Sequence, residues 1–539
     1  MSKIDVFARK SSGLVRQATW FDGFLTSIGT MNMVWIGVSY IWALSLFPGA
    51  EFHFSILITT FFCLFNALLF SLFATMMPRS GGDYVFNSRG ISPSVGFIVN
   101  FSMVVWNLFW IAYTSYMLSA IYASSAFVTI GDVLKIQWLK DLGESAAQPL
   151  ISFTIGAIVI VFIGFITYLG IRPFFRVMKI AFFLGILGVL VMIGVLLTAT
   201  RDTFIKVFEY NFGEGAYNEV IMNAMKLGWE PTISTEATLI AMAVAFQPLG
   251  FSIWSSYISG EIKDANKLRI NSYAMVGSLL TVGIFMLIGW WLSLNVFDYE
   301  FMGAIGYLYY NYPELSVLSI PPSTDYFTCM ISQNPIIVTL IGIGFIAWAF
   351  LYAPQSFLMV IRCMLAWSLD RLAPRKLSEV SSRFHTPVYG IIVTTLISLL
   401  FLAFFILTIY GYIPLDIFSV YGFNAFLGGG TLTFMAVAIS GILFPYRRDT
   451  KRIFESSPVN QRIGGIPILT LCGVLTLAFM GYITYLYVSL PQFGVSTIPS
   501  ISFILGVYAL GLIWYIVSRI YQKRKGIPIE LAFKEIPPE

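Results

Sequence analysis

The sequence predicts an all-α integral membrane protein with about twelve transmembrane helices, because of its composition and its long uncharged segments. Hydrophobic residues make up 58% of the 539 residues and charged residues only 11%, whereas roughly a quarter of the residues in an ordinary soluble domain are charged. A membrane-spanning helix needs about 20 predominantly apolar residues, and about twelve segments meet that requirement. The predicted spans are 20–47, 54–77, 95–125, 150–170, 177–199, 238–258, 272–296, 335–362, 387–409, 415–444, 466–489 and 497–518.

The basic residues divide unevenly between alternate loops, which predicts the orientation. If both termini are cytoplasmic, about 27 of the 32 Lys and Arg residues lie inside, and positively charged loops are retained on that side. The asymmetry predicts a multi-pass protein of the cell membrane with an even number of spans. The basic residues assigned to the outside are Lys135, Lys140, Arg201, Lys206 and Lys226.

The sequence carries no signature of an enzyme or of an ATP-driven pump. It has no G-x-x-x-x-G-K-[S/T] phosphate-binding loop and no evident set of nucleophile, base and acid. The four cysteines show no metal-ligand spacing. Basic tracts such as residues 447–452 lie just beyond helix ends, where they would contact anionic lipids. The expected partners are therefore a small-molecule substrate and the lipid bilayer, without nucleic acid, ATP or a cofactor.

No Lys, Arg, Asp or Glu lies near the centre of a predicted span, and Asp416 sits at the mouth of one. Carboxylates inside a membrane usually mark proton relays or contacts with charged substrates. Their lack argues against a proton pump built on a membrane-embedded acid.

Three motifs lie at the cytoplasmic ends of the predicted spans. They are M-P-R-S-G-G-D-Y-V-F at residues 77–86, S-G-E-I-K-D at residues 259–264 and R-C-M-L-A-W-S-L-D-R-L-A-P at residues 362–374. In sequence, order and placement they resemble the signatures of the amino acid, polyamine and organocation (APC) transporter superfamily, over about residues 20–445. The resemblance implies an amino acid permease.

The resemblance also implies a leucine-transporter-like fold, in which two inverted repeats of five helices are followed by two additional helices. The first helix of each repeat in such a fold is broken near the middle of the membrane. The implied organisation is a cytoplasmic N-terminus (1–19), the first repeat (20–199), an extracellular loop (200–237), the second repeat (238–444, with an extracellular loop at 298–334), two additional transmembrane helices (445–518) and a cytoplasmic tail (519–539).

The sequence offers helix breakers at both implied positions. The first span contains S-I-G-T-M-N at residues 27–32, and the sixth contains Q-P-L-G-F-S at residues 247–252. Paired interruptions in corresponding spans are the best sequence indication of a transporter's binding site. The alternative is that glycine and proline here merely allow close packing or a kink.

The ends of broken helices can bind a zwitterion without charged side chains, because N-termini are partly positive and C-termini partly negative. We expect amides around Gly29 and Met31, with the Thr30 hydroxyl, to bind a carboxylate. Carbonyls near Phe246 and Gln247 are expected to face an amine. The predicted substrate-binding residues are Ser27, Gly29, Thr30, Met31, Asn32, Asn107, Phe246, Gln247, Gly250, Ser252, Trp348, Tyr421 and Asn424, with Trp106 and Gln355 as further wall candidates.

Charged residues at the cytoplasmic helix ends are candidates for an inner gate, although topological charge and local capping would explain them equally well. The candidates are Glu261, Lys263, Arg362 and Asp370. The coupling ion is expected to be sodium or a proton. A sodium site between the first and eighth spans would use Ser356. At Ser252 several proton-coupled members of the superfamily carry Glu, which favours sodium coupling or exchange.

These observations predict a secondary active transporter, a symporter or antiporter, that moves amino acids or related amines by alternating access. The main alternative is a binding, sensing or accessory subunit that kept the fold without transporting. A channel would show a continuous polar stripe through several helices, and none is evident.

Overall fold

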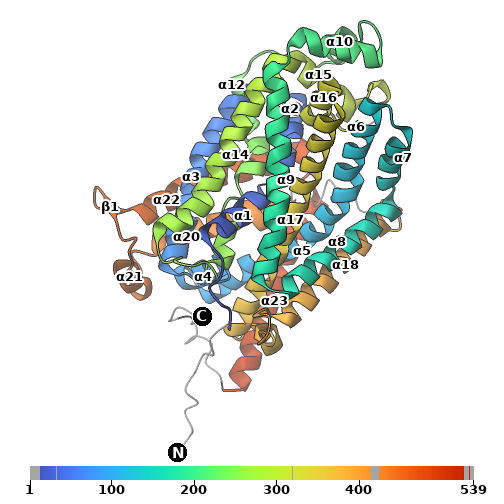
Figure 1. Cartoon of the computed structure of the whole chain (residues 1–539). Coiled ribbons are helices and arrows are strands. Elements are labelled where there is room, and N and C mark those ends of the chain that lie inside the picture. Colours follow the sequence, from blue (N-terminus) through green and yellow to red (C-terminus); the bar gives the residue numbers. More distant parts are fainter. Residues whose placement is uncertain (1–12, 32, 319, 414–423, 527–532, 534–539) are drawn as a thin grey trace, which may run out of the picture.

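The protein is a bundle of long helices. Figure 1 shows α9 and α17 running side by side along the molecule. Twelve helical segments of the described chain are long and apolar enough to cross a membrane, as predicted. The spanning elements are α1 (Trp20–Thr30) with α2 (Val34–Leu46), α3 (Phe52–Met76), α5 (Pro93–Met117) with η1 (Leu118–Ala123) and α6 (Ser124–Leu134), α8 (Pro149–Tyr168), α9 (Ile171–Thr198), α12 (Thr235–Ile240) with α13 (Met242–Leu249) and η2 (Trp254–Ile258), α14 (Leu268–Phe297), α17 (Pro335–Leu369), α18 (Val388–Ile409), η5 (Leu427–Thr431) with α20 (Leu432–Leu443), α22 (Ile468–Ser489) and α23 (Ile498–Arg524). The computed structural model describes residues 13–31, 33–318, 320–413, 424–526 and 533.

Shorter elements connect the spans at the two ends of the bundle. Figure 1 places α10 and α15 at one end and α4 and α21 toward the other, which we call the α10 end and the α4 end. A two-residue antiparallel pair, β1 with β2, sets Ile463 opposite Ile466. The connecting elements are α4 (Asp83–Gly90), α7 (Gln137–Ala146), α10 (Arg201–Phe212), α11 (Ala216–Lys226), α15 (Tyr299–Asn311), η3 (Pro313–Leu315), α16 (Thr324–Ser332), η4 (Arg375–Ser378), α21 (Arg448–Glu455), β1 (Arg462–Ile463), β2 (Ile466–Pro467) and η6 (Pro491–Phe493).

Several helices are longer than the predicted spans. The third span continues to Leu134, the fifth begins at Ile171 and the eighth continues to Leu369. The predicted limits were set by uncharged runs, which measure only the part of a helix suited to hydrocarbon. Helical hydrogen bonding continues past that part. The predicted start of the tenth span, at residue 415, lies outside the described residues.

The first and sixth spans lie at the centre of the bundle. In their most apolar windows 82% and 83% of the residues are buried, against 22% in the last span. The two spans that carry the predicted breaks are therefore enclosed by other helices, whereas α23 lies at the periphery. An interrupted backbone is tolerated at membrane depth only where protein or a cavity surrounds it.

The two long loops at the α10 end pack into one cap. Phe204 of α10 contacts Phe297, Phe301 and Phe327, at ring centroid distances of 4.9, 5.2 and 5.5 Å. The buried Trp229 donates its indole N–H to the carbonyl of Leu44, at 3.1 Å. The cap is thus anchored to α2, the second half of the broken first span.

Candidate functional site

The first span is interrupted where the sequence predicts. α1 ends at Thr30 and α2 begins at Val34, and no described side chain caps the start of α2. Asn32, a predicted contact, lies outside the described residues. The first amides of a helix lack partners within it and carry the positive end of its dipole. The start of α2 therefore presents positively polarised N–H groups at the break.

The sixth span is interrupted as well. α13 contains Pro248 and ends at Leu249, and helical structure resumes at Trp254. Gly250 follows α13 and donates its N–H to the carbonyl of Phe246, at 2.7 Å. A Cβ at Gly250 would lie 2.5 Å from the Phe246 ring. This glycine thus leaves room for an aromatic ring beside the break.

Hydrogen bonds join the two breaks. The Thr30 hydroxyl lies 3.0 Å from the carbonyl oxygen of Phe251 and 2.8 Å from that of Ser27, and it can donate to either. The N–H of Ser255 donates to the Ser27 hydroxyl, at 3.2 Å. Since the Thr30 proton is directed at carbonyls, only the lone pairs of that oxygen remain for a ligand. The predicted contact between Thr30 and a carboxylate stays a prediction.

The buried amide of Gln355 lies against the first break. A Cβ at Gly29 would lie 3.1 Å from Cγ of Gln355 and 3.4 Å from the carbonyl oxygen of Leu351. Gln355 is fully buried, and neither its amide oxygen nor its amide nitrogen has a hydrogen-bond partner among the described residues. The Ser356 hydroxyl is also buried. An unpaired buried polar group costs about 1–3 kcal/mol, so α17 presents here an amide that no described residue pairs with.

Other predicted polar contacts share this property. Both amide atoms of Asn424 and the amide nitrogen of Gln247 are buried without a partner among the described residues. The Asn107 amide nitrogen donates to the carbonyl of Met103 at 2.8 Å, and its amide oxygen has no partner among the same residues. Ser252 lies buried within the second break.

Two predicted tryptophan walls pack against glycines. A Cβ at Gly185 of α9 would lie 2.6 Å from the Trp348 ring, and one at Gly428 of η5 would lie 2.5 Å from the Trp106 ring. These indoles therefore fill helix interfaces. Tyr421 lies outside the described residues.

An aromatic cluster that sequence reasoning missed covers the second break. The Phe251 ring contacts that of Phe426 at 5.5 Å, and Trp110 contacts Phe426 at 5.6 Å and Tyr352 at 5.7 Å. Aromatic residues make up 17% of this chain, so no sequence signal separated these four from the others.

The predicted inner gate is only partly assembled. Arg362 and Glu261 form a bidentate ion pair, with Nε–Oε1 and Nη2–Oε2 distances of 2.5 and 3.0 Å, and their side chains are 1% and 2% exposed. Asp370 instead pairs with Arg89 of α4, at 3.1 Å, and the Lys263 side chain is exposed. The structure thus joins Glu261 with Arg362, and it joins Asp370 with a basic residue of α4 that the sequence did not single out.

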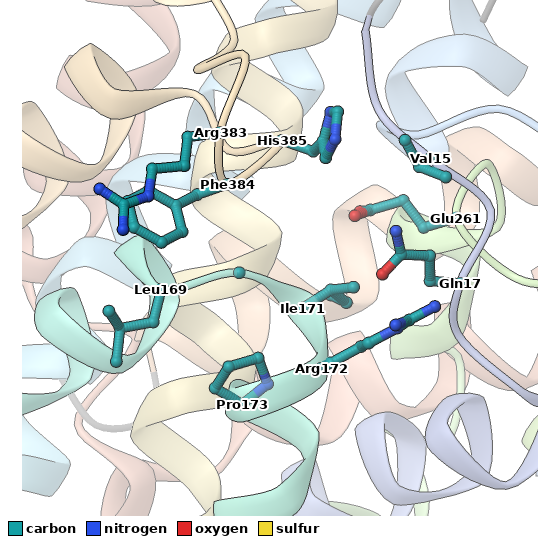
Figure 2. Close-up of a pocket in the computed structure, with 11 residues that line it drawn as sticks. Val15, Gln17, Leu169, Ile171, Arg172, Pro173, Glu261, Arg383, Phe384 and His385 are labelled. Carbon is teal, nitrogen blue, oxygen red and sulfur yellow. The ribbon is translucent and has the colours of Figure 1, made fainter.

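A pocket of about 160 Å³ reaches this gate. Figure 2 shows Glu261 and Gln17 on one side of it and Leu169, Arg383 and Phe384 on the other. Since Glu261 both lines the pocket and pairs with the buried Arg362, the ion pair lies directly behind the pocket. Its lining residues are Val15, Gln17, Leu169, Gly170, Ile171, Arg172, Pro173, Glu261, Arg383, Phe384 and His385.

The family follows from comparison with known proteins. The chain matches the family model described as amino acid permease over residues 19–513. The protein belongs to the amino acid permease family. This finding confirms the resemblance to the APC superfamily that the three motifs indicated. A search of curated proteins gave no match. The described part of the permease thus has twelve candidate spans and, at their centre, two broken helices joined by hydrogen bonds.

Proposed function

We propose that this permease is a secondary active transporter that moves amino acids or closely related amines by alternating access. The observation that carries the proposal is the pair of broken central spans, with buried side-chain amides near them that no described residue pairs with. Within a family of amino acid permeases, such unpaired groups have an evident role, which is to bind the polar parts of the substrate.

The two breaks supply groups of opposite polarity. The start of α2 at Val34 presents N–H groups to a carboxylate, and the end of α13 at Leu249 presents carbonyl oxygens to an ammonium group. Gln355 and Asn424 can both donate and accept hydrogen bonds. A zwitterion can therefore be bound in a core without charged side chains, while the Phe251 cluster excludes water.

Alternating access requires that the path to one side open while the other closes. The buried pair between Glu261 and Arg362 closes the α4 end, and the pocket that Glu261 lines forms the cytoplasmic vestibule of the proposed mechanism. Separation of this pair would connect the vestibule to the breaks. A gradient of sodium or protons, or exchange with a second substrate, would drive the cycle.

Uptake by the purified protein in proteoliposomes tests the proposal. A panel of amino acids and polyamines should include at least one that is taken up in a saturable manner, with sodium and proton gradients imposed separately and counterflow measured without either. Binding without uptake or counterflow would favour the accessory-subunit alternative. Flux that does not saturate would favour a channel.

Gln355→Leu is an informative variant. It replaces an unpaired buried amide by an apolar group of similar size, a change that is nearly neutral or stabilising for folding, yet it should lower substrate affinity. Gln137→Leu is the matched control, because Gln137 is an exposed residue of α7 whose side chain donates to Asp141 within the same helix. Equal affinities for the two variants would contradict the proposed site.

A further inference from the structure

Asp83 is a buried carboxylate that the proposed mechanism has not used. It begins α4, directly after the Gly-Gly turn of the first motif, and is fully buried. Its Oδ1 accepts hydrogen bonds from the Tyr257 hydroxyl and the Asn100 amide, each at 2.8 Å. Its Oδ2 has no hydrogen-bond partner in the part of the chain that the structure describes. Sequence reasoning passed over this acid because it lies between spans.

Four elements meet around this carboxyl group. Tyr257 belongs to η2, the inner half of the sixth span, and its carbonyl accepts the N–H of Gly81 at 3.1 Å. A Cβ at Gly82 would lie 2.5 Å from the Tyr257 ring, so the glycine turn is pressed against η2. Asn100 of α5 accepts the indole N–H of Trp367 of α17, at 2.7 Å. Asp83 thus joins the inner half of the sixth span to three other helices.

No cation pairs with Asp83 among the described residues. The neighbouring arginines form ion pairs with other carboxylates: Arg89 pairs with Asp370, and Arg362 pairs with Glu261. The other titratable groups near Asp83 are neutral when protonated: Tyr257 of η2, Cys363 of α17 and Tyr508 of α23. The neighbouring Tyr84 donates its hydroxyl to Asp370, at 2.8 Å. Burial without a counter-ion raises the pKa of Asp83 to about 7, although its hydrogen bonds from Tyr257 and Asn100 oppose the shift.

We propose that Asp83 is the proton-binding site of the transport cycle, which binds one cytoplasmic proton when η2 closes against α4 and releases it when η2 moves away. This inference rests on the proposed alternating-access function. In the closed state the carboxylate accepts the proton and becomes a neutral acid. When η2 leaves, water reaches the group and the acid returns the proton to the cytoplasm.

The direction of the pH effect follows from burial. In the closed state the group is buried, so the charged carboxylate loses its hydration at a large cost in free energy, whereas the neutral acid loses far less. A rise in cytoplasmic pH through about 7 therefore destabilises the closed state and favours opening at the α4 end. A sodium gradient is not needed for this effect.

The native thiol of Cys363 reports on opening without any substrate. It is fully buried, and its Sγ lies 3.4 Å from the amide nitrogen of Asn100 and 3.9 Å from the carbonyl oxygen of Gly81. The remaining cysteines, which are also buried, would be replaced by alanine. Labelling with N-ethylmaleimide would then be measured in inside-out vesicles between pH 6 and pH 8.

Asp83→Asn is the decisive variant, since it keeps the shape but cannot lose a proton. In Asp83→Asn the labelling rate should increase with pH only because the Cys363 thiol ionises. In the parent the rate should increase up to about tenfold more between pH 6 and pH 8. Asp264→Asn is the control, because Asp264 is exposed at the α4 end with a φ of +57° that Asn also adopts. It should behave like the parent.

Tyr257→Phe provides a second test if Asp83→Asn folds poorly. It keeps the ring that packs on Gly82 but removes a hydrogen bond to the carboxylate, and the midpoint of the pH response should rise. Identical pH responses in the parent and Asp83→Asn would overturn the inference, as would a labelling rate near zero at every pH in a protein that transports. If the pH response is present but neither uptake nor counterflow occurs, the proposed transport function fails instead.

Discussion

The buried ion pair between Glu261 and Arg362 allows the inner gate to be tested quantitatively. Replacing Arg362 by Met keeps a long apolar stem but removes the charge. The Glu261 carboxylate, 2% exposed in the structure, would then be buried without its counter-ion. Breaking a buried pair in this way costs about 3–5 kcal/mol, whereas replacing both partners by apolar residues is often neutral or stabilising.

A surface pair in the same protein supplies the comparison. Lys451 and Glu455 lie 3.7 Å apart on α21, four residues apart, and their side chains are 55% and 53% exposed. Solvent screens such pairs, which are worth about 0.3–0.5 kcal/mol. Arg362→Met should therefore lower the unfolding free energy by several times more than Lys451→Met does.

Reversible unfolding in mixed micelles, applied as a double-mutant cycle, measures both effects. The Glu261→Leu, Arg362→Met double variant should recover most of the stability that Arg362→Met loses, because no buried charge remains. Its gate should nonetheless open more readily, as shown by faster labelling of Cys363. A loss for Arg362→Met no larger than that for Lys451→Met would refute the reasoning.

Three further predictions concern the breaks, the orientation and the pH dependence. Gly29→Val and Gly250→Val should weaken substrate binding roughly ten- to over a hundredfold without preventing insertion, because each would remove a charge-assisted contact of about 1.5–3 kcal/mol. Ordinary substrate affinity in a well-expressed double variant would show that these glycines serve only packing. A cysteine at Arg448 should be labelled only from the cytoplasm and one at Lys140 only from outside, and labelling of position 448 in intact cells would disprove the topology. Burial raises the pKa of Asp83 from 3.8 to about 7, so its contribution to the unfolding free energy is present at low pH and is lost as the pH rises through about 7. Asp83→Asn should lose less stability than the parent between pH 5 and pH 8, and an equal loss would contradict this origin.

The candidate site could be predicted in part because its main features are local. The sequences around Gly29 and Gly250 contain the breakers that end α1 and α13, and local breakers act wherever the chain goes. Gln355 was recognised as a polar residue in an apolar span, which turns inward to find partners. The partners of each side chain were not predictable in this way. Asp370 bonds Arg89 rather than Arg362, and no spacing in the sequence indicates that pairing.

The sequence by itself determined that this chain has about twelve segments long and apolar enough to cross a membrane, and that helix breakers lie in the first and sixth of them. Both properties depend on short stretches of chain, since hydrophobic length sets a span and a glycine or proline ends a helix. Only the tertiary structure decided which side chains face each other across those breaks, and that an acid of the first motif, Asp83, lies buried with no cation paired to it among the described residues. The physical reason is that burial and charge pairing arise between helices that are hundreds of residues apart in sequence, where periodicity and composition carry no information.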